Sequence, residues 1–286
     1  MNNTFTLLPM SQRFTLTPGE VTEGSIKIVN PADATENFSY KVSVTPYGVV
    51  GENYTADLEH ESARTSISKW IKIAEPTGEV KPNEAKEVKF TIDVPEDAMV
   101  GGQYATIAVS SNASASNSSG VAVQNVLEMA SVIYGTVTGP IERKGEILGN
   151  DVPGFITNPP ATLGALIKND GNVHEDASFT ITVSDFFSGR QILPTEEDTG
   201  QYSELIMPET TRYIEREVNN LPALGVVKVS QTIHYMGSTP SVVEKTVIIC
   251  PIWFMALVFA TLAAIVFTVV HIVKKHKKNK TSKLVA

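Results

Sequence analysis

The sequence predicts an all-β protein, with two tandem immunoglobulin-like β-sandwich domains followed by one C-terminal transmembrane helix. Three observations predict this fold class. Short segments of alternating apolar and polar residues recur over residues 1–246, with turn residues between them, and this pattern is typical of antiparallel sheets that bury one face. One stretch of the chain occurs twice. Near the C-terminus, a long apolar segment is followed by a cluster of lysines.

The repeat aligns Ile28–Val44 with Ile167–Val183 without a gap. In each copy a strand ends at an asparagine, Asn30 or Asn169, and a polar turn leads into a second alternating strand. Asparagine tolerates turn conformations, which explains its place at the end of a strand. Two copies of one unit therefore indicate two similar sandwiches, and we expect the boundaries 1–139, 140–246, 247–273 (the helix) and 274–286 (a basic cytoplasmic tail).

The elements after the repeat also correspond in the two halves. Turns at Pro82-Asn83 and at Pro208-Glu209 each precede a strand, a further Pro and Gly turn and another alternating strand. Several short strands with turns every 8–12 residues are typical of a β-sandwich. We expect Tyr40 and Phe179, which occupy matching positions in the repeat, to be buried on the same strand of each sandwich.

Three further segments carry structural expectations. Tyr104 takes the place of the corner tyrosine of immunoglobulin-like folds, with Thr106 where a cysteine would stand. Trp70 belongs to an alternating strand, residues 67–73, and is expected to pack in the core. The low-complexity segment 110–120, with the sequence SSNASASNSSG, is expected to form a mobile hairpin tip.

In the apolar segment 247–273, His271 is the only residue other than Cys250 with an ionisable side chain, and the only one that can carry a positive charge. A helix needs about 20 residues to cross a ~30 Å hydrocarbon core, so this segment is long enough to span a lipid bilayer. Lysines next to a span stay on the cytoplasmic side. The sequence therefore predicts a single-pass protein of the cell membrane with residues 1–246 outside, and the residues that determine this topology are Lys274, Lys275, Lys277, Lys278 and Lys280.

Residues 1–5, MNNTF, have neither the basic region nor the apolar stretch of a secretory signal. Because an exported domain needs a signal, we expect that a signal peptide was removed or that the gene start is truncated. The third interpretation is a tail-anchored protein with its bulk in the cytoplasm. The lysines on one side of the span disfavour that interpretation.

Composition narrows the classes of function. Residues 1–247 contain all 31 acidic residues against 17 basic ones, a net charge of −14, which disfavours nucleic acid as a partner. Cys250 is the single cysteine, so an intrachain disulfide is excluded. An extracellular protein without disulfides is more typical of Gram-positive-type bacterial surfaces than of animal cells. We expect Cys250 to be a buried apolar residue rather than an acylation site. Asn-x-Ser/Thr triplets are interpreted as chance occurrences rather than glycan acceptors; they begin at Asn2, Asn37, Asn53, Asn112 and Asn117.

The sequence shows no catalytic constellation, and we expect neither enzymatic activity nor a cofactor. Its five histidines are scattered and lack the spacing of metal ligands. The acidic run 170–176 aligns with a turn of the repeat, so a turn is preferred over a calcium site. The candidate ligand-binding residues are Tyr47 and Tyr54, which lie beside glycines in a loop-like stretch where exposed rings could stack on sugar faces.

Several of these segments together resemble a known family. The residues 18–20 (PGE), the strand ending at 28–30 (IVN), Tyr54, Pro95 and the Gly101-Gly102 pair are similar to the N-terminal domain of bacterial WxL-interacting proteins. The resemblance implies two sandwich domains, one C-terminal span and a short lysine tail. It also implies peptidoglycan binding by the first domain and host or partner binding by the second.

We therefore expect a non-enzymatic, membrane-anchored protein of the bacterial cell envelope, whose extracellular domains bind cell-wall polymer or a surface protein, as in adhesion. The alternative is a structural or assembly subunit of a membrane or surface complex that associates through its transmembrane helix. That alternative depends on Ala256, Ala260 and Ala264, which recur every four residues and could let helices pack closely. Sedimentation with purified cell wall and crosslinking in native membranes would separate the two functions.

Overall fold

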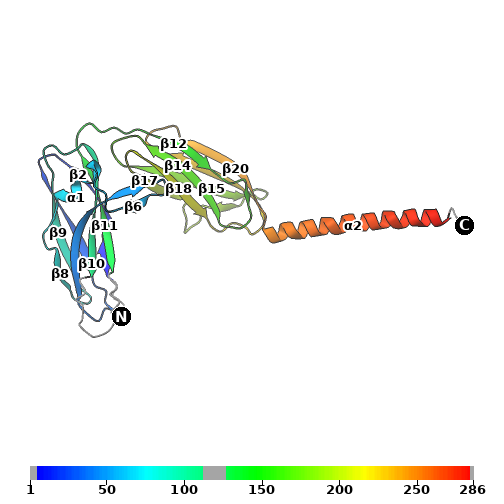
Figure 1. The fold of residues 1–286 in the computed structure, drawn as a ribbon, viewed down its shortest axis with the longest axis horizontal. Helices are drawn as coiled ribbons and strands as arrows, with labels where there is room; N and C mark the ends of the chain where they lie inside the picture. Colours follow the sequence, from blue (N-terminus) through cyan, green and yellow to red (C-terminus); the bar gives the residue numbers. More distant parts are fainter. Residues whose placement is uncertain (1–4, 112–126, 284–286) are drawn as a thin grey trace. The chain divides into compact units, whose positions relative to one another are not determined.

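The structure, a computed structural model, describes residues 5–111 and 127–283 of the chain, and side chains as far as Lys274. Within these residues it contains two immunoglobulin-like β-sandwiches and a long apolar helix at the C-terminal end (Figure 1). The predicted fold class is confirmed. The predicted hairpin tip lies outside the described residues from Asn112 onward.

The first sandwich has two main sheets. One sheet has the order β1-β3-β9-β7 and the other the order β2-β11-β10-β4-β8, with a small β5-β6 pair beside them. All pairings in the two main sheets are antiparallel except the parallel pair of β11 with β2. The strands are β1 (Thr6–Leu8), β2 (Ser11–Leu16), β3 (Val21–Val29), β4 (Phe38–Pro46), β5 (Gly48–Val50), β6 (Thr55–Asp57), β7 (Ile71–Ile73), β8 (Thr77–Val80), β9 (Ala85–Asp93), β10 (Gly101–Ser111) and β11 (Glu128–Val137).

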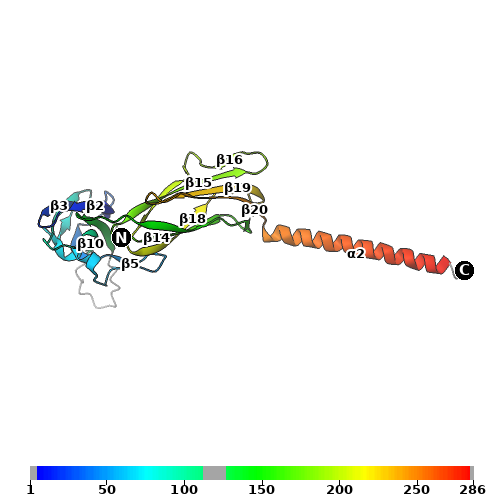
Figure 2. The same ribbon diagram turned by 90° about the horizontal axis from the view of Figure 1, so that it is seen from above.

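The second sandwich has a sheet of order β12-β14-β18 and a sheet of order β13-β20-β19-β15-β16, in which β17 also pairs with β15. Strands β15, β19 and β20 lie side by side (Figure 2). The strands are β12 (Gly145–Asp151), β13 (Phe155–Ile156), β14 (Ala161–Asn169), β15 (Glu175–Asp185), β16 (Gln191–Leu193), β17 (Gln201–Ile206), β18 (Thr210–Val218), β19 (Gly225–His234) and β20 (Ser241–Ile249); the helix is α2 (Ile252–Lys283).

The chain forms two compact units, and each unit is built from three separate stretches of the sequence. Unit 1 consists of Met1–Glu146, Ile167–Asp176 and Leu205–Tyr213. Unit 2 consists of Ile147–Leu166, Ala177–Glu204 and Ile214–Ala286. Two short segments from the second half of the sequence therefore belong to unit 1, where they help to build the site described below.

The period-2 alternation places apolar side chains in the cores as expected. Along β9, Val88, Phe90 and Ile92 are buried while the residues between them are not. Tyr40 on β4 and Phe179 on β15 are both buried, which confirms the equivalence predicted from the repeat.

The two asparagines of the repeat have the same structural role. The side-chain amide of Asn30 donates to the carbonyls of Glu36, at 3.0 Å, and Val80, at 2.9 Å. The amide of Asn169 donates to Val173, at 2.8 Å, and to a residue of β17. Each buried asparagine thus joins its turn to a third strand through hydrogen bonds to backbone carbonyls, so its own side-chain amide has partners inside the protein.

The predicted strand over residues 67–73 is wrong in its first half. Residues Ile67–Trp70 form one helical turn, α1, after the 3₁₀ turn η1 (Ala63–Thr65), and only Ile71–Ile73 are extended. Ile67 is buried and Trp70 packs against the same core. Residues three apart share a face of a helix, so this spacing fits a helical turn as well as an alternating strand.

The helix α2 begins at Ile252 rather than at the predicted Val247. Val247 and Ile249 are buried as the last inward-facing residues of β20, so the apolar run starts inside the sandwich. The stretch Ile252–Lys274 is long and apolar enough to cross a membrane, and none of it is buried within the described chain. The helix predicted from the sequence is therefore present, and it begins five residues later than predicted.

Candidate functional site

A small hollow in unit 1 contains Tyr47, one of the two predicted binding residues. Its volume is about 150 Å³, below the ~300 Å³ at which pockets for small molecules usually begin. We call it the Tyr47 pocket; its lining residues are Tyr47, Gly48, Val49, Ser62, Arg64, Thr65, Tyr104, Met207, Pro208 and Thr210. The pocket therefore combines the β4–β5 region, η1, β10 and the segment 205–213.

Arg64 is the cation of the Tyr47 pocket, and protein groups already satisfy it. Its guanidinium donates to both carboxylate oxygens of Glu209, at 3.2 and 2.5 Å, and to the carbonyl of Asn172 at 3.1 Å. The same contact lowers the pKa of the Glu209 carboxyl, so the pair is ionised and electrically neutral near pH 7. Arg64 thus positions the segments 167–176 and 205–213 rather than offering a free charge to an anion.

Tyr54 supports the pocket from outside its lining. Its hydroxyl hydrogen-bonds to the Thr210 hydroxyl and accepts from the backbone N–H of Met207 at 2.9 Å. The Arg212 guanidinium lies 4.7 Å from the centre of its ring. Tyr54 is half-buried rather than freely exposed, because residues of the segment 205–213 contact it, and burial raises its pKa.

A second aromatic group adjoins the pocket through Tyr104. The Tyr104 hydroxyl lies 3.2 Å from Nδ1 of His174, and the rings of Tyr104, Tyr134 and His174 contact one another. Burial raises the pKa of Tyr134 to about 12 and lowers the pKa of His174 to about 4. The phenols are therefore protonated and the imidazole is neutral near pH 7, so this cluster carries no charge.

Tyr104 occupies the corner position predicted for it, near the start of β10, and is buried. Its hydroxyl reaches a histidine side chain instead of the upstream backbone that a corner tyrosine contacts. Thr106, in the place of the cysteine, hydrogen-bonds to Thr45 on the neighbouring strand at 2.6 Å. This hydroxyl pair lies within one sheet, between the neighbouring strands β4 and β10, whereas the disulfide of immunoglobulin domains joins the two sheets.

The chemistry of the pocket is that of recognition. Among the described residues, no group of three or more His, Cys, Asp or Glu side chains could hold a metal ion. The rings of Tyr47 and Tyr104, the neighbouring hydroxyls and the apolar Val49 can accept a single neutral or apolar side chain. Nothing in the sequence signalled that residues 205–213 complete this pocket, because the repeat places their turn in the second sandwich.

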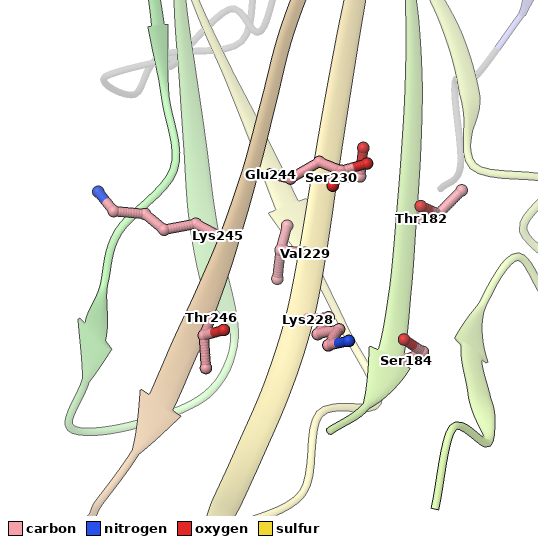
Figure 3. A pocket seen from close by; sticks show the side chains of 8 residues that line it. All are labelled: Thr182, Ser184, Lys228, Val229, Ser230, Glu244, Lys245 and Thr246. Carbon is pink, nitrogen blue, oxygen red and sulfur yellow. The ribbon is translucent and has the colours of Figure 1, made fainter. Parts of the chain in front are cut away.

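A second hollow lies on the outer face of the second sandwich, in unit 2, with a volume of about 370 Å³. Figure 3 shows its side chains on β15, β19 and β20. Hydroxyls of Thr182, Ser184, Ser230 and Thr246 face the hollow together with Lys228 and Glu244. It is a shallow polar surface with charges of both signs and contains none of the predicted binding residues.

The remaining predicted residues lie at the C-terminal end. Ala256, Ala260 and Ala264 lie on α2, and all three are exposed. Cys250 is half-buried and has a free thiol. Cys250 is therefore less buried than expected. Lys274 is the last residue whose side chain is described, so the side chains of Lys275, Lys277, Lys278 and Lys280 lie outside the described residues.

No protein-family model matches the sequence, and no curated protein matches it. Solved structures share the fold at low identity. A chain of a chaperone–tip adhesin complex of CFA/I fimbriae biogenesis has 11% identity over 85% of this chain and 98% of its own, with a TM-score of 0.43. The class 5 fimbriae chaperone CfaA has 12% identity over 85% and 99%, with a TM-score of 0.41. The E. coli chaperone DraB has 13% identity over 85% and 96%, with a TM-score of 0.39.

These comparisons correct the resemblance to WxL-interacting proteins, which is wrong. The structures that share the two-domain sandwich fold are described as fimbrial chaperones, and no family model supports a WxL-interacting protein. The short motifs at residues 18–20, 28–30 and 101–102 are turn and strand-end signals that many sandwiches share. Peptidoglycan binding loses its basis with that resemblance.

Proposed function

We propose that this chain is a non-enzymatic protein, anchored in a membrane by α2, that binds a protein partner through its β-sandwich region. The observation that carries the anchoring is the stretch Ile252–Lys274, whose apolar side chains are uncovered within the described chain. Covering one large apolar side chain is worth about 1.5–3 kcal/mol. A helix with this many exposed apolar side chains is therefore stable only where lipid or another protein surrounds it.

The lysines that follow the span support an orientation with the sandwiches outside the cytoplasm. A surface protein in that position meets secreted or envelope proteins. The net charge of −14 before the span favours a neutral or basic partner, because long-range repulsion slows the approach of an acidic one.

The Tyr47 pocket supports a protein as the ligand. Its volume of about 150 Å³ fits one side chain, and its one arginine is neutralised by Glu209. A partner that inserts an apolar or aromatic side chain would cover the half-buried Tyr47, and tyrosine is one of the residue types that dominate binding energy at protein interfaces. The fimbrial structures share the fold alone, so the proposal depends on the pocket, the charge and the span.

The test is site-specific photocrosslinking in the cells that make the full chain, with p-benzoylphenylalanine in place of Val49. One discrete protein adduct is expected. Tyr47→Ala should reduce its yield at least tenfold, as removal of an interface tyrosine worth about 2 kcal/mol would do. The matched control carries the same crosslinker in place of Val21, which is exposed on β3 and lies outside the pocket. An adduct that forms equally in the control, or sedimentation of the chain with purified cell wall in place of any adduct, would contradict the proposal.

A second candidate function, assembly through the helix, is favoured by one observation. Ala256, Ala260 and Ala264 recur at a spacing of four on the uncovered α2, so they share one face of the helix. Small residues let membrane helices approach closely. Ala260→Phe should then abolish a helix-mediated complex in native membranes, whereas Leu262→Phe, on another face, should preserve it.

A further inference from the structure

The outer face of the sheet that contains β15, β19 and β20 is polar over most of its length. Successive cross-strand pairs there are Thr182 with Ser230 and Ser184 with Lys228, and Lys228 is also paired with Thr246. Figure 3 shows these side chains on one face. This hydroxyl-bearing surface resembles ordinary solvent-exposed sheet.

The composition of the same face changes abruptly at the next row. Val226 is paired with Ile248, and Ile248 is paired with Phe155 of β13. Phe186, just beyond β15, donates its backbone N–H to the carbonyl of Val226 at 3.0 Å. The four residues form one apolar row across the sheet, in which the exposed fractions of Phe155, Ile248 and Phe186 are 48%, 47% and 41%.

Phe187 extends the apolar row and is 81% exposed. An ordered turn holds it in this position. The carboxylate of Asp185 accepts from the backbone N–H of Phe187 at 3.1 Å, and from the N–H and hydroxyl of Ser188 at 2.7 Å each. These hydrogen bonds lower the pKa of Asp185, so the turn is fully formed near pH 7. The phenylalanine is thus presented at low entropic cost to whatever covers it.

The apolar row lies at the end of the sheet from which the chain enters α2. Ile248 precedes Ile252, the first residue of the span, by four residues, so the two are at most about 14 Å apart. β13 is fixed to the same end, because Ile248 donates to Gly154 at 3.1 Å and Cys250 donates to Ile156 at 2.9 Å. Covalent connection therefore keeps the row close to any bilayer that holds α2.

We infer that the apolar row of Phe155, Ile248, Val226 and Phe186, together with Phe187, docks on the phospholipid surface next to the span. This inference rests on the membrane anchoring proposed above and adds a second, peripheral contact to it. Apolar side chains such as Phe and Leu bury into the boundary between headgroups and acyl chains when a protein surface lies on a bilayer. The ammonium of Lys228 lies 5.3 Å from the centre of the Phe186 ring, where it can meet lipid phosphate. Trp253, at the start of α2, is exposed as well, and tryptophan is enriched at membrane–water interfaces.

The experiment uses the full chain in proteoliposomes made of phosphatidylcholine and phosphatidylglycerol. In a Cys250→Ala background, single cysteines are introduced as Phe187→Cys, Ser178→Cys or Val258→Cys and labelled with the environment-sensitive fluorophore NBD. Ser178 is exposed on the same strand and face as the apolar row but about 27 Å from Phe186 along β15. Val258 lies within the span. Lipids brominated near the headgroup or near the chain ends then act as quenchers.

The expected result is a blue-shifted emission at position 187 that headgroup-proximal bromine quenches strongly, with no quenching at position 178. Quenching at 258 but not at 187 would overturn the inference while leaving the membrane anchor intact. Absence of quenching at 258 would overturn the anchor and the inference together. A blue shift at 187 without any quenching would also overturn the inference, because protein would then cover the row.

A second set of variants tests whether the apolar row, rather than the affinity of the fluorophore for lipid, brings position 187 into contact with the bilayer. With the label at position 187, Phe155→Ser combined with Phe186→Ser should lower the quenching at least twofold. Val21→Ser, which removes an exposed apolar side chain in unit 1, should leave it unchanged. Equal quenching in all three proteins would overturn the role of the row.

Discussion

At the scale of single residues, the two buried rings of the repeat differ in one polar atom. Tyr40 and Phe179 occupy equivalent strands, but only Tyr40 carries a hydroxyl, and within the described residues this hydroxyl has no hydrogen-bond partner. Its ring lies against Gly78 of β8, where a side chain would clash with it. The tyrosine therefore contributes through packing, and its polar atom contributes nothing favourable.

The first prediction follows from that packing. Tyr40→Ala and Phe179→Ala should each lower the free energy of unfolding by about 3–5 kcal/mol, the usual range for a buried aromatic ring. Tyr40→Phe should change it by less than about 1 kcal/mol, because no hydrogen bond is lost. Denaturant unfolding of the full chain in detergent measures all three. A loss below about 1 kcal/mol for either alanine variant would contradict the burial.

His174 couples stability to pH. Burial among uncharged rings lowers its pKa to about 4, whereas an unfolded chain has a histidine pKa of about 6.5. Below pH 6.5 the unfolded state therefore binds the proton first, and stability falls as the pH drops from about 6.5 to about 4. Its surroundings are Tyr104, Tyr134, Arg13, Glu175 and Asp176.

The second prediction is that this histidine costs up to about 3 kcal/mol of stability between pH 6.5 and 4, since one pKa unit is worth about 1.36 kcal/mol. His174→Gln should flatten the pH dependence of the unfolding midpoint over that window. His60→Gln, which changes an exposed histidine, is the control and should leave the slope as it is. An unchanged slope in the His174 variant would show that other groups set the acid limit.

At the scale of elements, the repeat extends to backbone geometry. Asn83 and Glu209 both have left-handed backbones, with φ of 62° and 59°, in the two turns that the sequence matched. The start of β10 also has a residue with positive φ, but there the cause is a close approach of two backbone segments. Gly101 has a φ of 102°, and an added Cβ would lie 2.2 Å from the carbonyl oxygen of Asn172. The glycine lets β10 accept the segment 167–176 within unit 1.

The third prediction compares two glycines. Gly101→Ala should destabilise the protein by about 1–3 kcal/mol more than Gly51→Ala, because only the former forces backbone apart. Gly51 has a φ of 71°, and a Cβ added there would meet no atom within 4 Å, so it controls for the strain of a left-handed alanine. The thermal unfolding midpoint measures both. Equal losses would indicate that segment 167–176 does not depend on this close approach.

At the scale of the whole molecule, the distribution of charge sets the proposed topology. The acidic residues all precede the span and six lysines follow or end it. Because lysines next to a span stay on the cytoplasmic side, the proposed topology has the two sandwiches outside. In this topology the apolar row would meet the outer surface of the lipid bilayer.

The fourth prediction tests that topology. Protease added to intact, wall-stripped cells should degrade the sandwiches and leave a protected fragment that contains α2 and the lysine tail. Detection with a tag at the C-terminus measures the fragment, and detergent lysis, which should remove the protection, is the control. Survival of the full-length chain on intact cells would mean that the sandwiches face the cytoplasm.

Much of the fold could be predicted from the sequence because its signals are local. Alternation with period 2 determines which face of a strand is buried, as at Val88, Phe90 and Ile92, and the gapless repeat shows that the sandwich occurs twice. The length and composition of the C-terminal segment determine a helix that could span a membrane. These features need no knowledge of what each strand pairs with.

Only the tertiary structure decided which distant residues meet. The pairing of Ile248 with Phe155 and Val226, and the hydrogen bonds of Tyr54 to Met207 and Thr210, join residues that are as many as 156 positions apart. It also decided that Val247 and Ile249 belong to β20 rather than to the helix. The physical reason is that apolarity determines burial but not the partner, since strand register and the choice of neighbour depend on packing across the whole sheet.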